Sequence, residues 1–255
     1  MLSRFIVGSV LATALVATLT GCSAGGSGDG SAAAPASSAA SPAPEPATVL
    51  AAAVAKTAGV NLKVVLAGDK AEEDMTGSYD ATHKIGSIAQ ASGTDRMTII
   101  ATPDDLYLAG LSDFKGKTMH LKIAKLDAKS PLAMFTDVVT PLTLLTGVKD
   151  VKLTAPGSFT GTLDLTKAQG ATAGARKFLD YVLAAAANRA NAVKFTASVN
   201  EQGYLAEFNT TLPNIADGKD GEYNLKLSDF GSPITITKPT GSKVVEAPAA
   251  MYSQQ

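Results

Sequence analysis

The chain has 255 residues, with 22 Lys and Arg against 23 Asp and Glu, and a formal net charge of −1 at pH 7. Its basic residues form no block, which excludes the electrostatic surface that nucleic acids require, so we expect no nucleic-acid partner. Cys22 is the only cysteine, and no disulfide can therefore form within the chain.

The first 21 residues have the pattern of a secretory signal peptide. Arg4 supplies a short basic region, and an apolar stretch of about fifteen residues (5–19) follows it. This stretch is shorter than the roughly 20 residues that a helix needs to cross a hydrocarbon layer, so we do not expect a permanent membrane span. We assign residues 1–21 to a signal peptide that is removed.

The residues around Cys22 resemble the bacterial lipobox, in which a Leu and two small residues precede a Cys; here they are Leu19, Thr20 and Gly21. In proteins with this motif, diacylglycerol is attached to the thiol and the chain is cut directly before the Cys. The alternative, an ordinary signal peptide with an incidental Cys, would more often show an A-x-A-like site, which is absent. We expect a lipidated Cys22 whose two acyl chains hold the protein at the outer face of the plasma membrane.

A tether separates this anchor from the folded part. Residues 23–46 consist of Gly, Ser, Ala and Pro with only Asp29 and Glu45 besides, a composition that cannot bury a core. We predict a lipidated Cys and tether over 22–46, a single folded domain over 47–240, and a flexible tail over 241–255.

The first half of the domain is predicted to be one helix followed by antiparallel strands. An Ala-rich segment (47–56) indicates a helix that Gly59 ends. Beyond it, apolar residues alternate with a period of two, and turn residues such as Pro103, Asp104 and Asp105 separate the segments. The predicted strands cover residues 62–67, 75–81, 84–92, 96–101, 106–109 and 118–123.

The second half mixes helices and strands. Apolar residues recur at helical spacing from Leu132 to Leu145, and Pro141 interrupts them, which indicates two short helices with a break. A longer amphipathic helix is predicted over 175–186. Strands are predicted over 151–153, 158–165, 193–199, 204–212 and 222–228, with a last short strand at Ile234 and Ile236. The expected fold class is α+β, a single large curved antiparallel sheet (a half-barrel) with helices covering its concave side.

No catalytic or metal-binding pattern is recognisable in the sequence. We interpret His83, in a predicted turn, and His120, on the polar face of a strand, as solvated, since neither has a His or Cys at metal-ligand spacing. A G-x-S-x-G elbow is absent, and the kinase-like tripeptide Asp229-Phe230-Gly231 lacks the other kinase motifs. We expect no enzyme activity, no cofactor and no metal.

The order of these features over residues 47–239 resembles the LppX/LprA/LprF/LprG lipoproteins of actinobacteria. The shared features are a lipobox, a polar tether, an Ala-rich first helix, antiparallel strands and, most specifically, the closing stretch LSDFGSPITI (227–236). The resemblance implies a LolA/LolB-like fold, an antiparallel half-barrel closed by helices around an apolar cavity. It also implies binding or transport of acylated lipids or glycolipids, and it assigns no individual binding residue.

Two functions are compatible with this sequence. In the first, a membrane-anchored monomer binds or carries a lipid, a glycolipid or another amphiphile in an apolar cavity between sheet and helices, with residues 132–145 as its lid. The alternative is a structural, interaction or sensor lipoprotein of the same fold with a packed core and no ligand. The residues expected to line the cavity are Leu132, Phe135, Val138, Leu142, Phe178, Val182, Phe195 and Val199.

Overall fold

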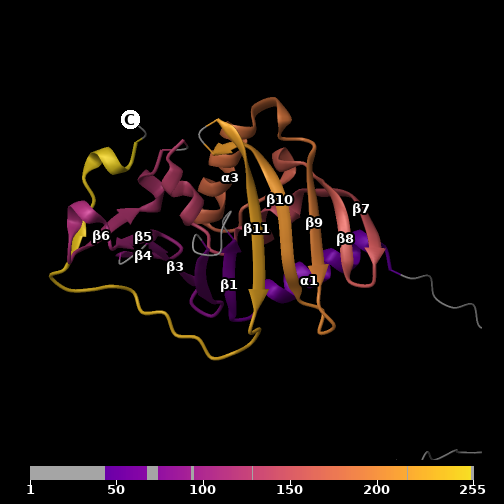
Figure 1. The fold of residues 1–255 in the computed structure, drawn as a ribbon, viewed down its shortest axis with the longest axis horizontal. Helices are drawn as coiled ribbons and strands as arrows, with labels where there is room; N and C mark the ends of the chain where they lie inside the picture. The colour runs from indigo at the N-terminus through magenta and orange to yellow at the C-terminus, as the bar shows by residue number, and fades with distance from the viewer. Residues whose placement is uncertain (1–43, 68–73, 93–94, 128, 217, 254–255) are drawn as a thin grey trace, which may run out of the picture. The chain divides into compact units, whose positions relative to one another are not determined.

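Strands dominate the fold in the computed structural model (Figure 1), which describes residues 44–67, 74–92, 95–127, 129–216 and 218–253. The predicted signal peptide, the lipidation site Cys22 and residues 23–43 of the tether lie outside this range. The strands are β1 (Leu62–Ala67), β2 (Met75–Asp80), β3 (Ile85–Ser92), β4 (Asp95–Ala101), β5 (Asp105–Ala109), β6 (Thr118–Lys122), β7 (Val148–Ala155), β8 (Ser158–Leu163), β9 (Val193–Val199), β10 (Leu205–Ala216), β11 (Lys219–Ser228) and β12 (Val244–Glu246).

Helices are fewer than strands in the described chain. The α-helices are α1 (Pro46–Ala58), α2 (Thr140–Leu144) and α3 (Ala173–Ala186). Short 3-10 helices connect other elements: η2 (Ser112–Phe114), η3 (Ile123–Lys125), η4 (Pro131–Phe135), η5 (Leu145–Gly147), η6 (Leu165–Lys167), η7 (Ala187–Arg189) and η8 (Ala249–Met251).

All twelve described strands belong to one open sheet in the order β12-β6-β5-β4-β3-β2-β1-β11-β10-β9-β8-β7. Strands β1 to β6 form one antiparallel meander and β7 to β11 form a second, and the two join where β1 pairs with β11. The expected single large sheet is confirmed. It is mixed rather than wholly antiparallel, because β12 pairs in parallel with β6, and its edges do not close into a barrel.

One face of the sheet carries the apolar side chains. Along β9, Val193, Phe195 and Ala197 are buried while Lys194 and Thr196 are exposed, as the alternation of the sequence predicts. The same alternation holds at the junction of the meanders, where the register pairs two buried residues, Val64 of β1 with Leu227 of β11. This apolar face forms one continuous core with the helices.

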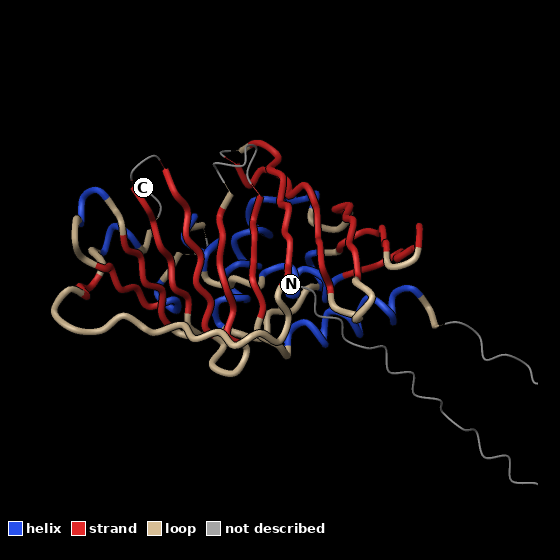
Figure 2. The backbone as a smooth tube through the Cα atoms, turned by 60° about the horizontal axis from the view of Figure 1, so that its bottom comes forward, coloured by secondary structure: helices blue, strands red, loops and turns tan. Residues whose placement is uncertain are grey.

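Helices α1 and α3 both contact β10, and Figures 1 and 2 show them on the same side of the sheet. The predicted first helix is confirmed, with Gly59 as its C-cap. Thr57 ties α1 to the sheet: its hydroxyl donates to the Ala53 carbonyl at 2.8 Å and accepts the Leu205 amide N–H at 2.9 Å. A buried polar group that is paired on both sides in this way fixes the helix in one position.

The predicted pair of short helices between Leu132 and Leu145 is present, but the first, η4, is a 3-10 helix. The second, α2, begins at Thr140, directly before Pro141, where the sequence predicts a helix start.

The predicted strand at Ile234 and Ile236 is wrong. The chain leaves the sheet after β11 through a turn in which Asp229 and Gly231 have φ of 53° and 76°. Strand β11 already pairs with β1 on one side and β10 on the other, so these residues have no free edge beside it. They run instead to the far end of the sheet (Figure 1). Residues 241–255 were expected to form a flexible tail. At the far end of the sheet this segment contains β12 and η8.

Candidate functional site

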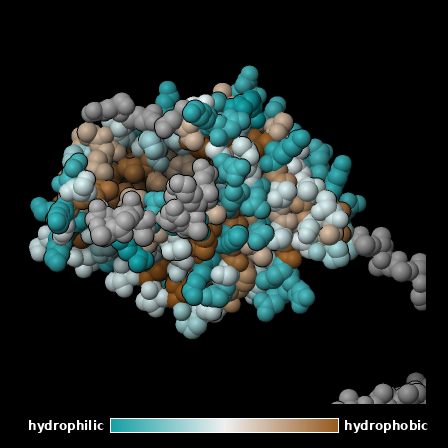
Figure 3. Space-filling view, in the orientation of Figure 1, coloured by the Kyte–Doolittle hydropathy of each residue, from teal (hydrophilic) through white to brown (hydrophobic). Residues whose placement is uncertain are grey.

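A cavity of about 450 Å³ lies between the sheet and α3. Strands β1, β2, β3, β10 and β11 supply one wall, and η4 with α3 supplies the other. Figure 3 shows apolar side chains in a hollow beside α3 on the face turned to the viewer. We call this cavity the α3 pocket. Its lining residues are Val64, Leu66, Met75, Ile88, Lys129, Pro131, Met134, Phe135, Asp137, Val138, Tyr181, Ala184, Ala185, Asn214, Ile215, Ala216, Gly218, Tyr223 and Leu225.

Helix α3 presents two different stripes to its surroundings. Thr172 caps the helix, since its side chain accepts the Ala175 amide N–H at 3.0 Å. Residues at spacings of four, Phe178, Val182 and Ala186, are fully buried in the core. The neighbouring stripe (Tyr181, Ala184 and Ala185) faces the pocket. The two alanines leave room there because their side chains end at Cβ.

The wall that η4 and the residues directly after it supply is fixed by close packing against β3. Val138 is buried and lies over Gly86, and a Cβ on Gly86 would clash with the Val138 side chain. Only a residue without a side chain allows the wall to approach the sheet so closely. Pro131, Met134 and Phe135 continue this wall toward the pocket mouth.

Hydrogen bonds hold the end of α3 to the tip of the β10–β11 hairpin. The Asn214 side-chain amide donates to the Ala185 carbonyl at 2.9 Å and accepts from Arg189 at 2.8 Å. Arg189 also makes a bidentate ion pair with Asp220, at 2.7 and 2.9 Å. Asn214 and Ala185 both line the pocket, so these contacts hold two elements of its lining together.

Among the residues that the structure describes, two charged side chains line the α3 pocket. Lys129 is exposed at its mouth, and its ammonium forms no ion pair with any residue that the structure describes. Asp137 accepts hydrogen bonds from the Thr143 hydroxyl at 3.1 Å and the Val139 amide at 3.2 Å. Burial raises the pKa of Asp137, and these hydrogen bonds offset only part of that effect.

Two of the eight residues that we predicted to line a cavity, Phe135 and Val138, line the α3 pocket. The other six contribute to the core or its margin. Leu142, Phe178, Val182 and Phe195 are buried in the core, and Leu132 and Val199 are half-buried against it.

The residues expected to line a cavity did not include Tyr181, Ala184 and Ala185, which line the α3 pocket. Their spacing of three and four residues marks a second helical stripe, which was the available signal. Ile215, near the tip of the β10–β11 hairpin, was also missed, because β10 extends four residues beyond its predicted end at Leu212. Tyr223 lies on the predicted strand 222–228 but was not among the residues expected to line a cavity.

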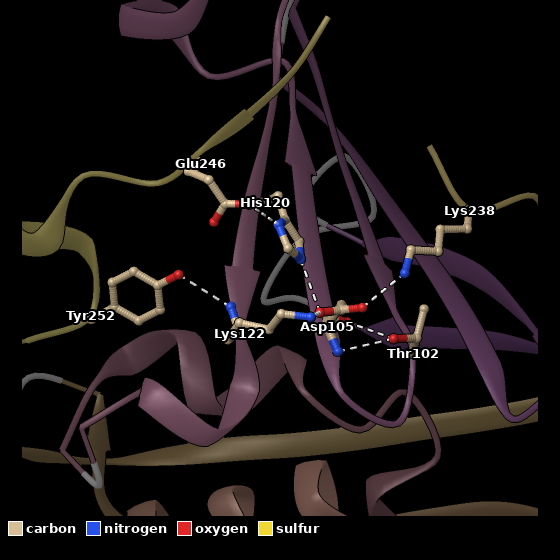
Figure 4. Close-up of polar contacts among 7 residues, drawn as sticks. All are labelled: Thr102, Asp105, His120, Lys122, Lys238, Glu246 and Tyr252. Atoms are coloured by element: carbon tan, nitrogen blue, oxygen red, sulfur yellow. Dashed lines mark hydrogen bonds and ion pairs between the residues drawn. The ribbon is translucent and has the colours of Figure 1, made fainter. Parts of the chain in front are cut away.

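A second site, which is polar, lies at the far end of the sheet, where the C-terminal segment meets β5 and β6 (Figure 4). The Asp105 carboxylate, whose side chain is 6% exposed, accepts hydrogen bonds from Lys122 Nζ at 2.6 Å, Lys238 Nζ at 2.9 Å and His120 Nε2 at 2.9 Å. His120 Nδ1 lies 2.6 Å from Glu246 Oε1. We call these five residues the C-terminal clasp.

The electrostatics of the clasp favour the ionised carboxylate. Burial by itself raises the pKa of Asp105, but the hydrogen bonds from Lys122, Lys238 and His120 outweigh it and hold the pKa well below its ordinary value. Contacts with Tyr107 and then Asp105 raise the pKa of Lys238. The clasp therefore joins residues far apart in the chain through charge-assisted hydrogen bonds.

The interpretation of His120 as solvated is wrong. Its side chain is 12% exposed, because its ring stacks on Tyr107 with centroids 5.0 Å apart and Glu246 covers its other nitrogen. Both ring nitrogens face carboxylate oxygens, so both can donate only when the ring is an imidazolium. His83 is the more exposed histidine and bonds to Asp80 at 2.8 Å.

Comparisons with known proteins identify no family. No family model matches the chain, and no curated protein matches it. Among solved structures, the chain is similar to an uncharacterized conserved protein from Thermus thermophilus, with 9% sequence identity and a TM-score of 0.38; the match covers 78% of this chain and 98% of that one.

The described residues contain neither a metal-binding cluster nor a membrane-spanning helix. No group of three or more His, Cys, Asp or Glu there could hold a metal ion. No helix in the same residues is long and apolar enough to cross a membrane.

Proposed function

We propose that this protein is a lipid-anchored envelope lipoprotein that binds or carries a lipid or other amphiphile and has no catalytic role. The observation that carries the proposal is the α3 pocket, a mostly apolar cavity of about 450 Å³ with a solvent-facing mouth. Its size falls within the range of roughly 300–1,000 Å³ that is typical of small-molecule sites. In this proposal the sheet is a LolA/LolB-like half-barrel, and α1 and α3 cover its concave side.

The distribution of side chains in the pocket suits an amphiphile. Val64, Ile88 and Leu225 are buried and aliphatic, so they would contact an apolar chain. Each buried methylene contributes about 0.8 kcal/mol. Lys129 is exposed at the mouth, so a polar group of the ligand that is bound beside it would stay in contact with water.

The alternative function is an interaction or sensor lipoprotein without a ligand. The observation that favours it is the dense core, which takes in Phe178, Val182 and Phe195, three of the residues predicted to line a cavity. The two functions differ in whether the α3 pocket is occupied.

The test fills the pocket from α3. Ala185→Phe places a phenyl ring in the cavity, where it is expected to abolish uptake of a fluorescent fatty-acid analogue while the melting temperature stays within a few degrees, because the added volume enters empty space. The full chain would be purified in a sterol-based detergent, which has no linear acyl chain to compete.

Two matched variants complete the test. Ala186→Phe, in the fully buried neighbouring position, is expected to overpack the core and destabilise the protein by about 1–3 kcal/mol. Ala55→Phe, on the exposed face of α1, is expected to change neither property. Full uptake by the Ala185→Phe variant, or no uptake by the wild type, would favour the interaction protein.

A further inference from the structure

The volume of the α3 pocket limits how many acyl chains it can hold. At about 450 Å³ it is about three times the ~150 Å³ apolar cavity that accommodates one benzene ring of six carbons. On that scale it holds about eighteen carbon atoms, which corresponds to a single acyl chain. The two chains of a membrane phospholipid need about twice that room.

The pocket has one apolar end and one exposed end. Val64, Ile88 and Leu225 are 1%, 6% and 1% exposed, whereas Lys129 and Gly218 are exposed to solvent. A linear molecule bound there has its apolar end on the sheet and its other end in water.

The charges that line the pocket favour an anion at the mouth. Among the described lining residues, Lys129 is the only cation, and its ammonium has no described carboxylate within ion-pair distance. The one carboxyl among the described lining residues, Asp137, is half-buried, accepts hydrogen bonds from Thr143 and Val139, and has a pKa that burial raises. Lys129 is therefore the charge available to a ligand.

We infer that the α3 pocket binds a single-chain anionic amphiphile, with one acyl chain against β1, β3 and β11 and a carboxylate or phosphate head at Lys129. This inference rests on the proposed function and narrows it, since it excludes diacyl phospholipids and larger glycolipids as ligands that enter the pocket whole.

Displacement of a dansyl-labelled fatty acid from the full chain, in sterol-based detergent, tests the inference. Palmitate and palmitoyl lysophosphatidylglycerol are expected to displace the probe, and the comparison of the two distinguishes a carboxylate from a phosphate head. Dipalmitoyl phosphatidylglycerol is expected not to displace it.

The role of Lys129 is tested with Lys129→Gln. This change is expected to weaken palmitate binding by about two- to five-fold, as for an exposed ion pair, and to leave neutral monopalmitoylglycerol unaffected. Lys125→Gln, an exposed lysine of η3 that does not line the pocket, is the matched control and is expected to leave palmitate binding unchanged.

The outcomes separate this inference from the proposed function. If the diacyl lipid displaced the probe as strongly as palmitate does, the inference of a single acyl chain would be overturned. If Lys129→Gln left the palmitate affinity unchanged, the inference of an anionic head at Lys129 would be overturned. In both cases binding of the probe would still support the proposed lipid-binding function. Failure of the wild type to bind the probe, or of any lipid to displace it, would overturn the proposed function itself.

Discussion

Removal of the charge on Asp105 should loosen the C-terminal clasp. Asp105→Asn keeps the size of the side chain but takes away the carboxylate that accepts hydrogen bonds from Lys122, Lys238 and His120. The two ammonium groups and the largely buried imidazole of His120 would then face a neutral amide, and Lys238 would no longer hold the crossing segment (229–243) to β5.

The structure sets the size of the effect. Breaking a fully buried ion pair costs about 3–5 kcal/mol, but both lysines here are about half exposed, at 48% and 49%, so solvent screens part of the interaction. Hydrogen bonds to charged groups contribute about 1.5–3 kcal/mol. We therefore expect Asp105→Asn to lower the free energy of unfolding by about 2–3 kcal/mol, which is about 5–10 °C in melting temperature for a domain of this size.

Circular dichroism melting of the full chain is the assay, and Asp104→Asn is the matched control. Asp104 precedes Asp105 and is exposed, so its substitution should change stability by less than about 0.5 kcal/mol. Equal melting temperatures for the two variants would refute the assignment of the clasp as a stabilising contact.

The pH dependence supplies a second readout. Because the pKa of Asp105 is lower in the folded protein, its contribution is present above the ordinary carboxyl value near 4 and is lost as the pH falls below it. The difference in stability between wild type and Asp105→Asn should therefore shrink from about pH 5 downward. A difference that grows as the pH falls below about 5 would contradict the role of the ionised carboxylate.

Three further predictions test other parts of the protein. Cys22→Ala should abolish metabolic labelling with an alkyne fatty acid, and globomycin should cause the uncut wild type to accumulate; a wild type that is never labelled would disprove the lipid anchor. A chain that begins at Ala47 should melt within a few degrees of one that begins at Ser23, because the tether has no residues to bury, and a larger loss would show that it packs on the domain. Gly86→Ala should destabilise the protein by about 1–3 kcal/mol, because the new methyl group clashes with Val138. Val138→Ala in the same chain should restore part of the lost stability. If the free-energy changes of the two substitutions, measured by melting, were strictly additive, the clash would be ruled out.

The sequence predicted those elements whose pattern is local. Alternation along 193–199 and helical spacing along 175–186 are complete within each segment, so β9 and α3 could be found without knowledge of their neighbours. The alternation of Ile234 and Ile236 is equally regular, but a strand also needs a free edge, and β11 has none. Strand β12 has only three residues and pairs with β6, more than a hundred residues earlier, so no local pattern indicates it.

The site was harder to predict than the fold for a related reason. Large apolar residues of α3, such as Phe178 and Val182, mark the stripe that packs, whereas a cavity remains beside the stripe with small side chains, here Ala184 and Ala185. A search for large apolar residues therefore finds the core and misses the pocket. His120 shows the same limit for polar groups, since its partner Glu246 lies 126 residues away in the chain.

The clasp and the α3 pocket share no residue, and this separation makes stability and binding independently testable. Asp105, His120 and Lys238 act at the end of the sheet that β5, β6 and β12 form, while the pocket lies where β1 meets β11. Asp105→Asn should therefore lower the melting temperature without changing uptake of the fatty-acid analogue well below that temperature. Ala185→Phe should abolish uptake without lowering the melting temperature. If the clasp variant lost uptake while still folded, the crossing segment 229–243 would have to transmit strain to the pocket, and the two sites would form one coupled unit.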